Sequence, residues 1–149
     1  MADLVRLPDV AMCTLRTRGG NALGLPCVGK SQRRGNDLIL AIGPDEWLAM
    51  APDADGAALC GRMGTLDGVA LDVSGNRVTY RVQGPDVLWF LSAGVSYDLH
   101  RLKAGDAIST LCARAPVILI AEAHEAFMLL TRRSFAAYVD TWAKSVDIR

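Results

Sequence analysis

The segment 107–130, AISTLCARAPVILIAEAHEAFMLL, decides the fold of this 149-residue chain. It contains three runs rich in apolar residues, at 107–113, 117–121 and 126–130, which are separated by short polar or charged breaks. Runs of this length that are bounded by turn residues predict β-strands. The connections are too short to hold crossover helices, so we expect the three strands to pair antiparallel.

The same pattern extends towards the N-terminus. Strands are predicted at 10–17, 37–42, 47–51 and 68–73, and Val78, Tyr80 and Val82 alternate with polar residues as in a half-buried strand. The tripeptide 84–86, Gly-Pro-Asp, predicts the start of a helix, because proline suits the first helical position and aspartate favours the first turn. The same tripeptide occurs at 43–45, which is too little to predict a repeat.

Two further helices are expected. Asp53 is placed to cap a short helix that continues through Met63. The last helix is predicted to begin near Thr131 or Ser134, with one apolar stripe made of Phe135, Tyr138, Val139, Trp142 and Val146. Strands outnumber helices, so the fold class is predicted to be α+β with antiparallel sheets. The length suits a single domain over 1–149, or two fused lobes of half that size.

Composition and charge exclude several classes of protein. Sixteen basic and sixteen acidic residues cancel, so no overall field attracts nucleic acid or an anionic membrane. Apolar stretches such as 115–121 are far shorter than a membrane span, and residues 1–6 lack the apolar run of a signal peptide. We therefore expect a cytoplasmic protein. Its 51% hydrophobic content is either core or surface that another protein covers.

Residues that could carry chemistry are few. Segment 24–31, GLPCVGKS, matches the phosphate-binding pattern GxxxxGK[ST], but its neighbours lack the preceding strand and the following helix, so a basic loop is favoured. His100 with Asp98 could orient a substrate or relay a proton, although a turn role is the simpler interpretation. Four dispersed cysteines predict free thiols rather than a zinc site. We expect no catalytic, cofactor-binding or metal residue on this chain.

Two features favour contact with a partner. Arg132 and Arg133 are expected to open the last helix, where the helix dipole disfavours cations. An acid elsewhere in the fold, another subunit, a bound anion or plain solvation would compensate them. The tryptophans Trp47, Trp89 and Trp142 lie on apolar stripes, where core packing and an interface anchor are the two interpretations.

Several of these segments together resemble the gamma subunit family of heterotetrameric sarcosine oxidase. The resemblance rests on 40–48 (LAIGPDEWL), 71–74 (LDVS) with Arg77, 84–86 (GPD), Gly94, 98–100 (DLH), 132–136 (RRSFA) and Trp142. The arrangement of LDVS, arginine and GPD is also similar to the aminomethyltransferase-like folate-binding fold, which implies two small interwoven lobes. The family's early alanine-rich helix is reduced here to 21–26, so that helix is expected to be short or lost.

The resemblance implies an assembly with alpha, beta and delta subunits that oxidatively demethylates sarcosine to glycine. It implies that FAD, FMN, NAD, tetrahydrofolate and zinc belong to those partners and that this chain is a non-catalytic structural subunit. Candidate interface residues are Arg132, Arg133, Trp142, Asp98 and His100. The alternatives are a subunit of a related N-methyl amino-acid dehydrogenase, such as N-methylglutamate dehydrogenase, and a free-standing folate-binding or one-carbon-transfer protein.

Overall fold

Two antiparallel five-stranded sheets carry the fold, and each belongs to its own part of the chain. The computed structural model describes residues 2–19, 24–64 and 68–147. Contacts divide the chain into unit 1, Met1–Pro8 with Arg77–Arg149, and unit 2, Asp9–Asn76. The chain therefore starts in unit 1, forms all of unit 2 and then returns. The predicted class of antiparallel sheets with few helices is confirmed.

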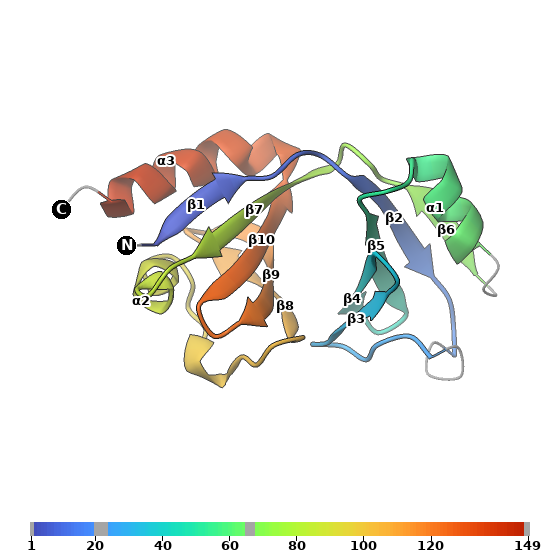
Figure 1. The fold of residues 1–149 in the computed structure, drawn as a ribbon, viewed down its shortest axis with the longest axis horizontal. Helices are drawn as coiled ribbons and strands as arrows, with labels where there is room; N and C mark the ends of the chain where they lie inside the picture. Colours follow the sequence, from blue (N-terminus) through green and yellow to red (C-terminus); the bar gives the residue numbers. More distant parts are fainter. Residues whose placement is uncertain (1, 20–23, 65–67, 148–149) are drawn as a thin grey trace. The chain divides into compact units, whose positions relative to one another are not determined.

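Unit 1 contains the three strands from which the fold was predicted. Its sheet has the order β1-β7-β10-β9-β8, with β1 (Asp3–Arg6), β7 (Arg77–Gln83), β8 (Ala107–Cys112), β9 (Ala115–Ala123) and β10 (Ala126–Arg132). Its helical segments are α2 (Val87–Ser92), η1 (Leu99–Arg101), η2 (Arg133–Phe135) and α3 (Ala136–Asp147) (Figure 1). Every neighbouring pair in this sheet is antiparallel, as the short connections required.

The core of unit 1 follows the alternation seen in the sequence. Val78, Tyr80 and Val82 lie in one buried cluster with residues of β9, β10, α2 and α3. The Tyr80 hydroxyl donates a hydrogen bond to the Ala136 carbonyl oxygen at 3.3 Å, which ties the first turn of α3 to the sheet. The opposite side chains of β9 and β10 are buried too, namely Ile118, Ile120, Met128 and Leu130. Both faces of these two strands are therefore apolar.

Unit 2 repeats this plan with less helix. Its sheet has the order β3-β4-β5-β2-β6, with β2 (Ala11–Arg16), β3 (Ser31–Arg34), β4 (Asp37–Gly43), β5 (Glu46–Ala51) and β6 (Val69–Asp72). The helix α1 (Gly56–Met63) packs on β2 and β6 (Figure 1). Small residues line the sheet beneath it, and Leu59 and Met63 are the two buried residues of the helix. Alanines on the sheet leave room for a helix to approach closely.

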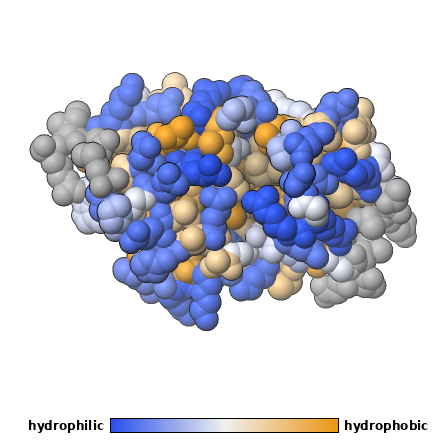
Figure 2. All heavy atoms as spheres, in the orientation of Figure 1, coloured by the Kyte–Doolittle hydropathy of each residue, from blue (hydrophilic) through white to orange (hydrophobic). Residues whose placement is uncertain are grey.

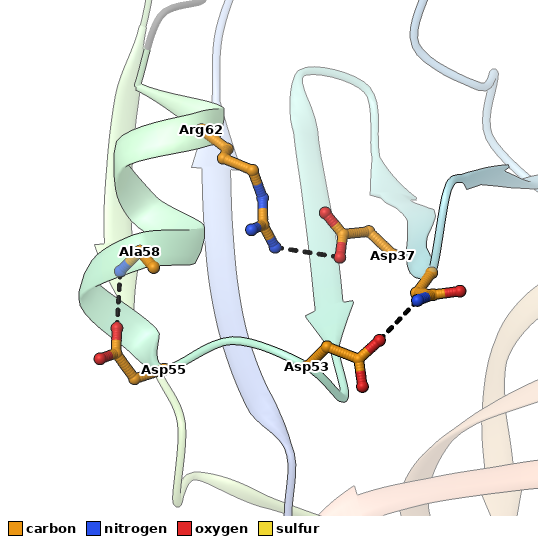
Figure 3. A network of polar contacts seen from close by, with 6 residues as sticks. Asp37, Asp53, Asp55, Ala58 and Arg62 are labelled. Carbon is orange, nitrogen blue, oxygen red and sulfur yellow. Dashed lines mark hydrogen bonds and ion pairs between the residues drawn. The ribbon is translucent and has the colours of Figure 1, made fainter.

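A polar network fixes α1 and corrects one prediction (Figure 3). The helix begins at Gly56 and its cap is Asp55, whose carboxylate accepts a hydrogen bond from the Ala58 amide at 2.8 Å. Asp53, the predicted cap, lies in the preceding turn and accepts a hydrogen bond from the Asn36 side chain at 2.5 Å. Arg62 pairs with Asp37 at 3.0 Å, which links the last turn of α1 to β4.

The two sheets share one strand order. In each unit a three-stranded meander, β8-β9-β10 or β3-β4-β5, pairs through its last strand with the strand that precedes it in the chain, β7 or β2. An edge strand, β1 or β6, then pairs with the other side of that strand. The two Gly-Pro-Asp tripeptides are not equivalent in this scheme, because one forms the β4–β5 turn and the other precedes α2.

Several boundaries differ from the prediction. The edge strands β1 and β3 were not predicted, because their sequences, DLVR and SQRR, lack an apolar alternation. Of the reduced helix expected at 21–26, positions 21–23 lie outside the described residues and 24–26 are not helical. No helix among residues 2–19, 24–64 and 68–147 is long and apolar enough to span a membrane. The face in Figure 2 is mainly hydrophilic, with smaller hydrophobic patches between the charged side chains.

Candidate functional site

Trp142 on α3 is the centre of a packed cluster in unit 1. Its indole meets the Phe90 ring of α2 with ring centroids 5.2 Å apart and planes tilted by 57°. Gly94, just after α2, lies directly beneath it, because a Cβ atom at Gly94 would come within 2.7 Å of the indole. Two residues from the family resemblance, Gly94 and Trp142, are thus joined by a steric requirement.

The hairpin between β8 and β9 belongs to the same cluster. Its turn residues Ala113 and Arg114 both have positive φ, 49° and 74°, and the Ala113 amide donates a hydrogen bond to the Gly94 carbonyl oxygen at 2.9 Å. The Tyr138 hydroxyl donates to the Ala113 carbonyl oxygen. The loop after α2, the hairpin turn and α3 are therefore held together around Trp142.

The sequence alone did not predict that Phe135 and Tyr138 are exposed. Both belong to the predicted stripe of α3, but they are 36% and 49% exposed. Val139 of the same stripe is buried together with Ala136 and Ala143, because alanines let the helix sit close to the sheet. Trp89 is 46% exposed, so core packing, one of its two interpretations, is wrong and an interface anchor remains. Helical spacing of apolar residues alone does not tell whether the alanines or the aromatic residues form the buried face of a helix.

These side chains define the candidate site, which we call the aromatic surface. It consists of Trp89, Tyr97, Phe135 and Tyr138, all of them in unit 1 and on α2, α3 or the segments next to them. Aromatic residues are enriched at protein interfaces, where they bury a large area at low conformational cost. Exposed aromatic side chains of this kind suit contact with another protein.

Arg132 and Arg133 lie at a junction that differs from the prediction. β10 continues through Arg132, which is opposite Arg77 in the pairing with β7, and Arg133 begins the η2 turn. The helix α3 starts only at Ala136, so neither arginine opens it. Because the dipole effect fades within the first turn, that electrostatic reason for a partner is weakened. Both arginines also make interactions within the chain.

Asp98 and His100 flank a buried anchor. Leu99 is in the core of unit 1, whereas Asp98 and His100 on either side of it are exposed. The Arg101 amide donates a hydrogen bond to the Asp98 carbonyl oxygen at 3.1 Å, which closes the η1 turn. The triplet therefore inserts a leucine and leaves two polar side chains outside. The interface role of Asp98 and His100, like that of the two arginines, stays a prediction.

Asp72 and Ser74 form a corner in unit 2. The Asp72 carboxylate accepts hydrogen bonds from the Ser74 hydroxyl at 2.6 Å and the Ser74 amide at 3.0 Å, and these bonds lower the pKa of Asp72. The Met12 amide donates to the Ser74 hydroxyl oxygen at 3.0 Å. A Cβ atom at Gly56 would overlap the carboxylate, so this corner also packs against the start of α1. The LDVS motif thus has a structural role.

Other candidates for chemistry do not form a site. Ser31 begins β3, so a strand rather than a helix follows the segment that matches the phosphate-binding pattern. In the described parts of the chain, no three His, Cys, Asp or Glu side chains lie close enough to share a metal ion. An open hollow in unit 2 is lined by Arg16, Arg18, Asp45 and Glu46 among others. Arg16 pairs with Glu46 at 3.3 Å, so the charges there compensate each other.

Known proteins resemble this chain over most of its length. Residues 9–148 match the model of the "Sarcosine oxidase, gamma subunit family". Sarcosine oxidase subunit gamma of Corynebacterium sp. (strain P-1) is 34% identical over 108 residues, which are 70% of this chain and 53% of that protein. Sarcosine oxidase subunit gamma of Arthrobacter sp is 33% identical over the same shares. The chain therefore spans about half the length of the curated relatives it matches.

A solved structure shares the fold. A chain of the heterotetrameric sarcosine oxidase from Corynebacterium sp. U-96, in complex with pyrrole 2-carboxylate, matches with a TM-score of 0.84 at 25% identity. The match covers 97% of this chain and 83% of that chain. The likeness includes both units, since neither unit alone could account for that coverage.

Proposed function

The chain belongs to the sarcosine oxidase gamma subunit family, and from this membership we propose that it is the gamma subunit of a heterotetrameric sarcosine oxidase. The observation that carries the proposal is the structural match over 97% of the chain to a chain of such an oxidase. In this role the protein is a structural subunit without catalytic residues. The complex demethylates sarcosine oxidatively to glycine and passes the one-carbon unit to tetrahydrofolate.

The partners in this proposal are alpha, beta and delta subunits, which hold FAD, FMN, NAD, tetrahydrofolate and zinc. The fold is proposed to be of the aminomethyltransferase-like folate-binding kind, and the division into two units, each with an antiparallel sheet, supports the two small lobes of that proposal. The complex is proposed to work in the cytoplasm.

The aromatic surface is the proposed contact with the partner subunits. Trp89 and Tyr138 each leave close to half of their surface exposed, and an interface would bury it. Arg132, Arg133, Trp142, Asp98 and His100 are secondary candidates.

Co-purification tests this proposal. The tagged chain is isolated from its native source, and the eluate is examined for three further chains and for flavin absorbance. Trp89→Ser should lower the yield of partners at least tenfold without unfolding the chain, because Trp89 is exposed. Val28→Ser, at an exposed apolar position in unit 2, is the matched control. The double variant Arg132→Ala, Arg133→Ala should have a smaller effect.

The result that overturns the proposal is a colourless chain that is recovered alone. If such a chain also bound tetrahydrofolate, it would be a free-standing folate-binding protein. Flavin-containing partners that are retained equally by wild type and by Trp89→Ser would keep the subunit role and reject the aromatic surface as its contact.

A further inference from the structure

Two of the four cysteines meet inside unit 2. Cys13 is on β2 and Cys60 is on α1, the helix that packs on β2, and the Cys60 side chain is near enough to raise the pKa of the Cys13 thiol. Cys13 is fully buried in the core cluster, and Cys60 packs against the same cluster while remaining partly exposed. Forty-six residues separate the two in the chain, so only the packing of α1 on β2 brings them together.

The other two cysteines lack this arrangement. Cys27 is exposed in the loop before β3, and Cys112 is buried on β8 in unit 1. Burial raises the pKa of the Cys112 thiol to about 12. The chain therefore offers one exposed thiol and one buried thiol as internal references for the pair.

We propose that Cys13 and Cys60 form an oxidation site at which a hydroperoxide converts the two thiols into a disulfide between β2 and α1. Reactivity of a thiol follows its exposure, so the partly exposed Cys60 reacts first. One peroxide oxygen is transferred to the Cys60 sulfur as the O–O bond breaks, which gives a sulfenic acid and one molecule of water from hydrogen peroxide, or of alcohol from an organic hydroperoxide. The Cys13 sulfur then attacks the Cys60 sulfur, the new S–S bond forms as the S–O bond breaks, and the oxygen leaves as water with the Cys13 proton.

The environment of Cys13 explains why this thiol is not the first of the two to react. Burial, followed by the nearby Cys60 side chain, raises the pKa of Cys13 to about 12, so this thiol is a poor nucleophile towards oxidants in solution. Its sulfur nevertheless lies next to the one sulfur that it must attack. Cys60 and the Asp72 carboxylate both disfavour a thiolate at Cys13, and they outweigh the Leu71 backbone, which favours it. The pair is therefore stable as two thiols until Cys60 is oxidised.

The disulfide would fasten a short helix to the sheet of unit 2. α1 has eight residues, of which Leu59 and Met63 are buried. A cross-link between residues 13 and 60 closes a long loop, which restricts the unfolded chain and favours the folded one. The sulfurs must first move to the bond distance of about 2.0 Å. The oxidised protein should therefore have a higher Tm, by several degrees, than the reduced one.

Mass spectrometry of the full chain treated with hydrogen peroxide tests the proposal. The expected result is the loss of two hydrogens from the intact mass, a peptide that links Cys13 to Cys60, and a raised Tm that a reducing agent returns to its starting value. Cys60→Ser should abolish all three effects. Cys27→Ser should abolish none of them, and Cys112 should remain a thiol throughout.

Two outcomes would overturn the proposal. One is oxidation of Cys60 to a sulfinic acid while Cys13 remains a thiol, which would mean that the sulfurs cannot reach each other. The other is oxidation confined to Cys27, which would mean that the pair is protected from peroxide. Both are read from the wild-type chain, so the test does not depend on the stability of any variant.

Discussion

Unit 1 and unit 2 have the same strand order but are covered by different side chains. Eight of the nine aromatic residues belong to unit 1, and Trp47 is the one in unit 2. Three of the four cysteines belong to unit 2, whose sheet is lined by alanines beneath α1. A shared topology therefore does not require a shared core. What it requires is that each sheet has one face apolar enough to hold its helix.

The covering of each sheet explains how its helix is held. In unit 1, the twelve residues of α3 and the added helix α2 bury bulky groups such as Phe90, Val139 and Trp142. In unit 2, α1 is shorter. It is held by the cap at Asp55, by the ion pair of Arg62 and by close packing against the Asp72 corner. Trp47 on β5 donates a hydrogen bond to the Pro26 carbonyl oxygen at 2.8 Å, which ties the segment between β2 and β3 to the sheet. Unit 1 is thus stabilised mainly by the burial of apolar surface.

The largest expected effect is in the apolar core of unit 1. Phe127 is fully buried on β10, so Phe127→Ala removes a ring from a packed cluster and leaves a cavity. It should lower the free energy of unfolding by about 3–5 kcal/mol. Chemical denaturation measures the loss, and hydrogen exchange should place most of it in the sheet of unit 1. Equal loss of protection in both sheets would contradict the division into two units.

The matching change in unit 2 is Leu59→Ala. Leu59 is fully buried, and its loss should cost about 2–4 kcal/mol, at the lower end because a short helix can settle towards the sheet. Faster proteolysis at α1 together with unchanged hydrogen exchange in β7–β10 is the expected pattern. A cost above that of Phe127→Ala would reverse the comparison between the two cores.

A smaller effect is expected from adding one methyl group at Gly94. The new Cβ atom would lie 2.7 Å from the Trp142 indole, so the ring must move away from Phe90. Gly94→Ala should destabilise by about 1–3 kcal/mol, as overpacking does. The matched control is Gly61→Ala in α1, where no atom lies within 4 Å of the added Cβ. That variant should stabilise by about 0.5–1 kcal/mol because alanine favours helix, and thermal denaturation of both would reveal the opposite signs.

The smallest effect is the acid sensitivity of unit 2. Hydrogen bonds from the Ser74 hydroxyl and then from the Ser74 amide lower the pKa of Asp72 in the folded state. The stability that results is fully present above the unfolded-state pKa and is lost as the pH falls through the lower folded-state pKa. Unfolding measured against pH should therefore show a weaker acid-side loss in Asp72→Asn than in wild type. Ser74→Ala should also reduce the loss of stability at acidic pH. If both variants lose as much stability at acidic pH as wild type, the hydrogen bonds between Ser74 and Asp72 are not its cause.

Local patterns predicted most strands but not their neighbours in the sheets. The predictions at 37–42, 78–82 and 126–130 agree with β4, β7 and β10 to within two residues at each end, because apolar alternation and turn residues act over short distances. The polar strand β3 pairs with β4 through backbone hydrogen bonds, which any sequence can make. The family resemblance, which rests on short motifs, was confirmed. The exposure of Phe135 and Tyr138 was not predicted, because it depends on how α3 packs on its sheet.

By itself the sequence determined the antiparallel class, the family and the absence of any strong charge imbalance, since each depends on residue type and spacing along the chain. Only the tertiary structure decided that β1 joins unit 1 before the chain enters unit 2, that Gly94 lies under Trp142, and that Cys13 meets Cys60. The physical reason is that these are contacts between residues far apart in the chain. They depend on which elements pack together, and no local period carries that information.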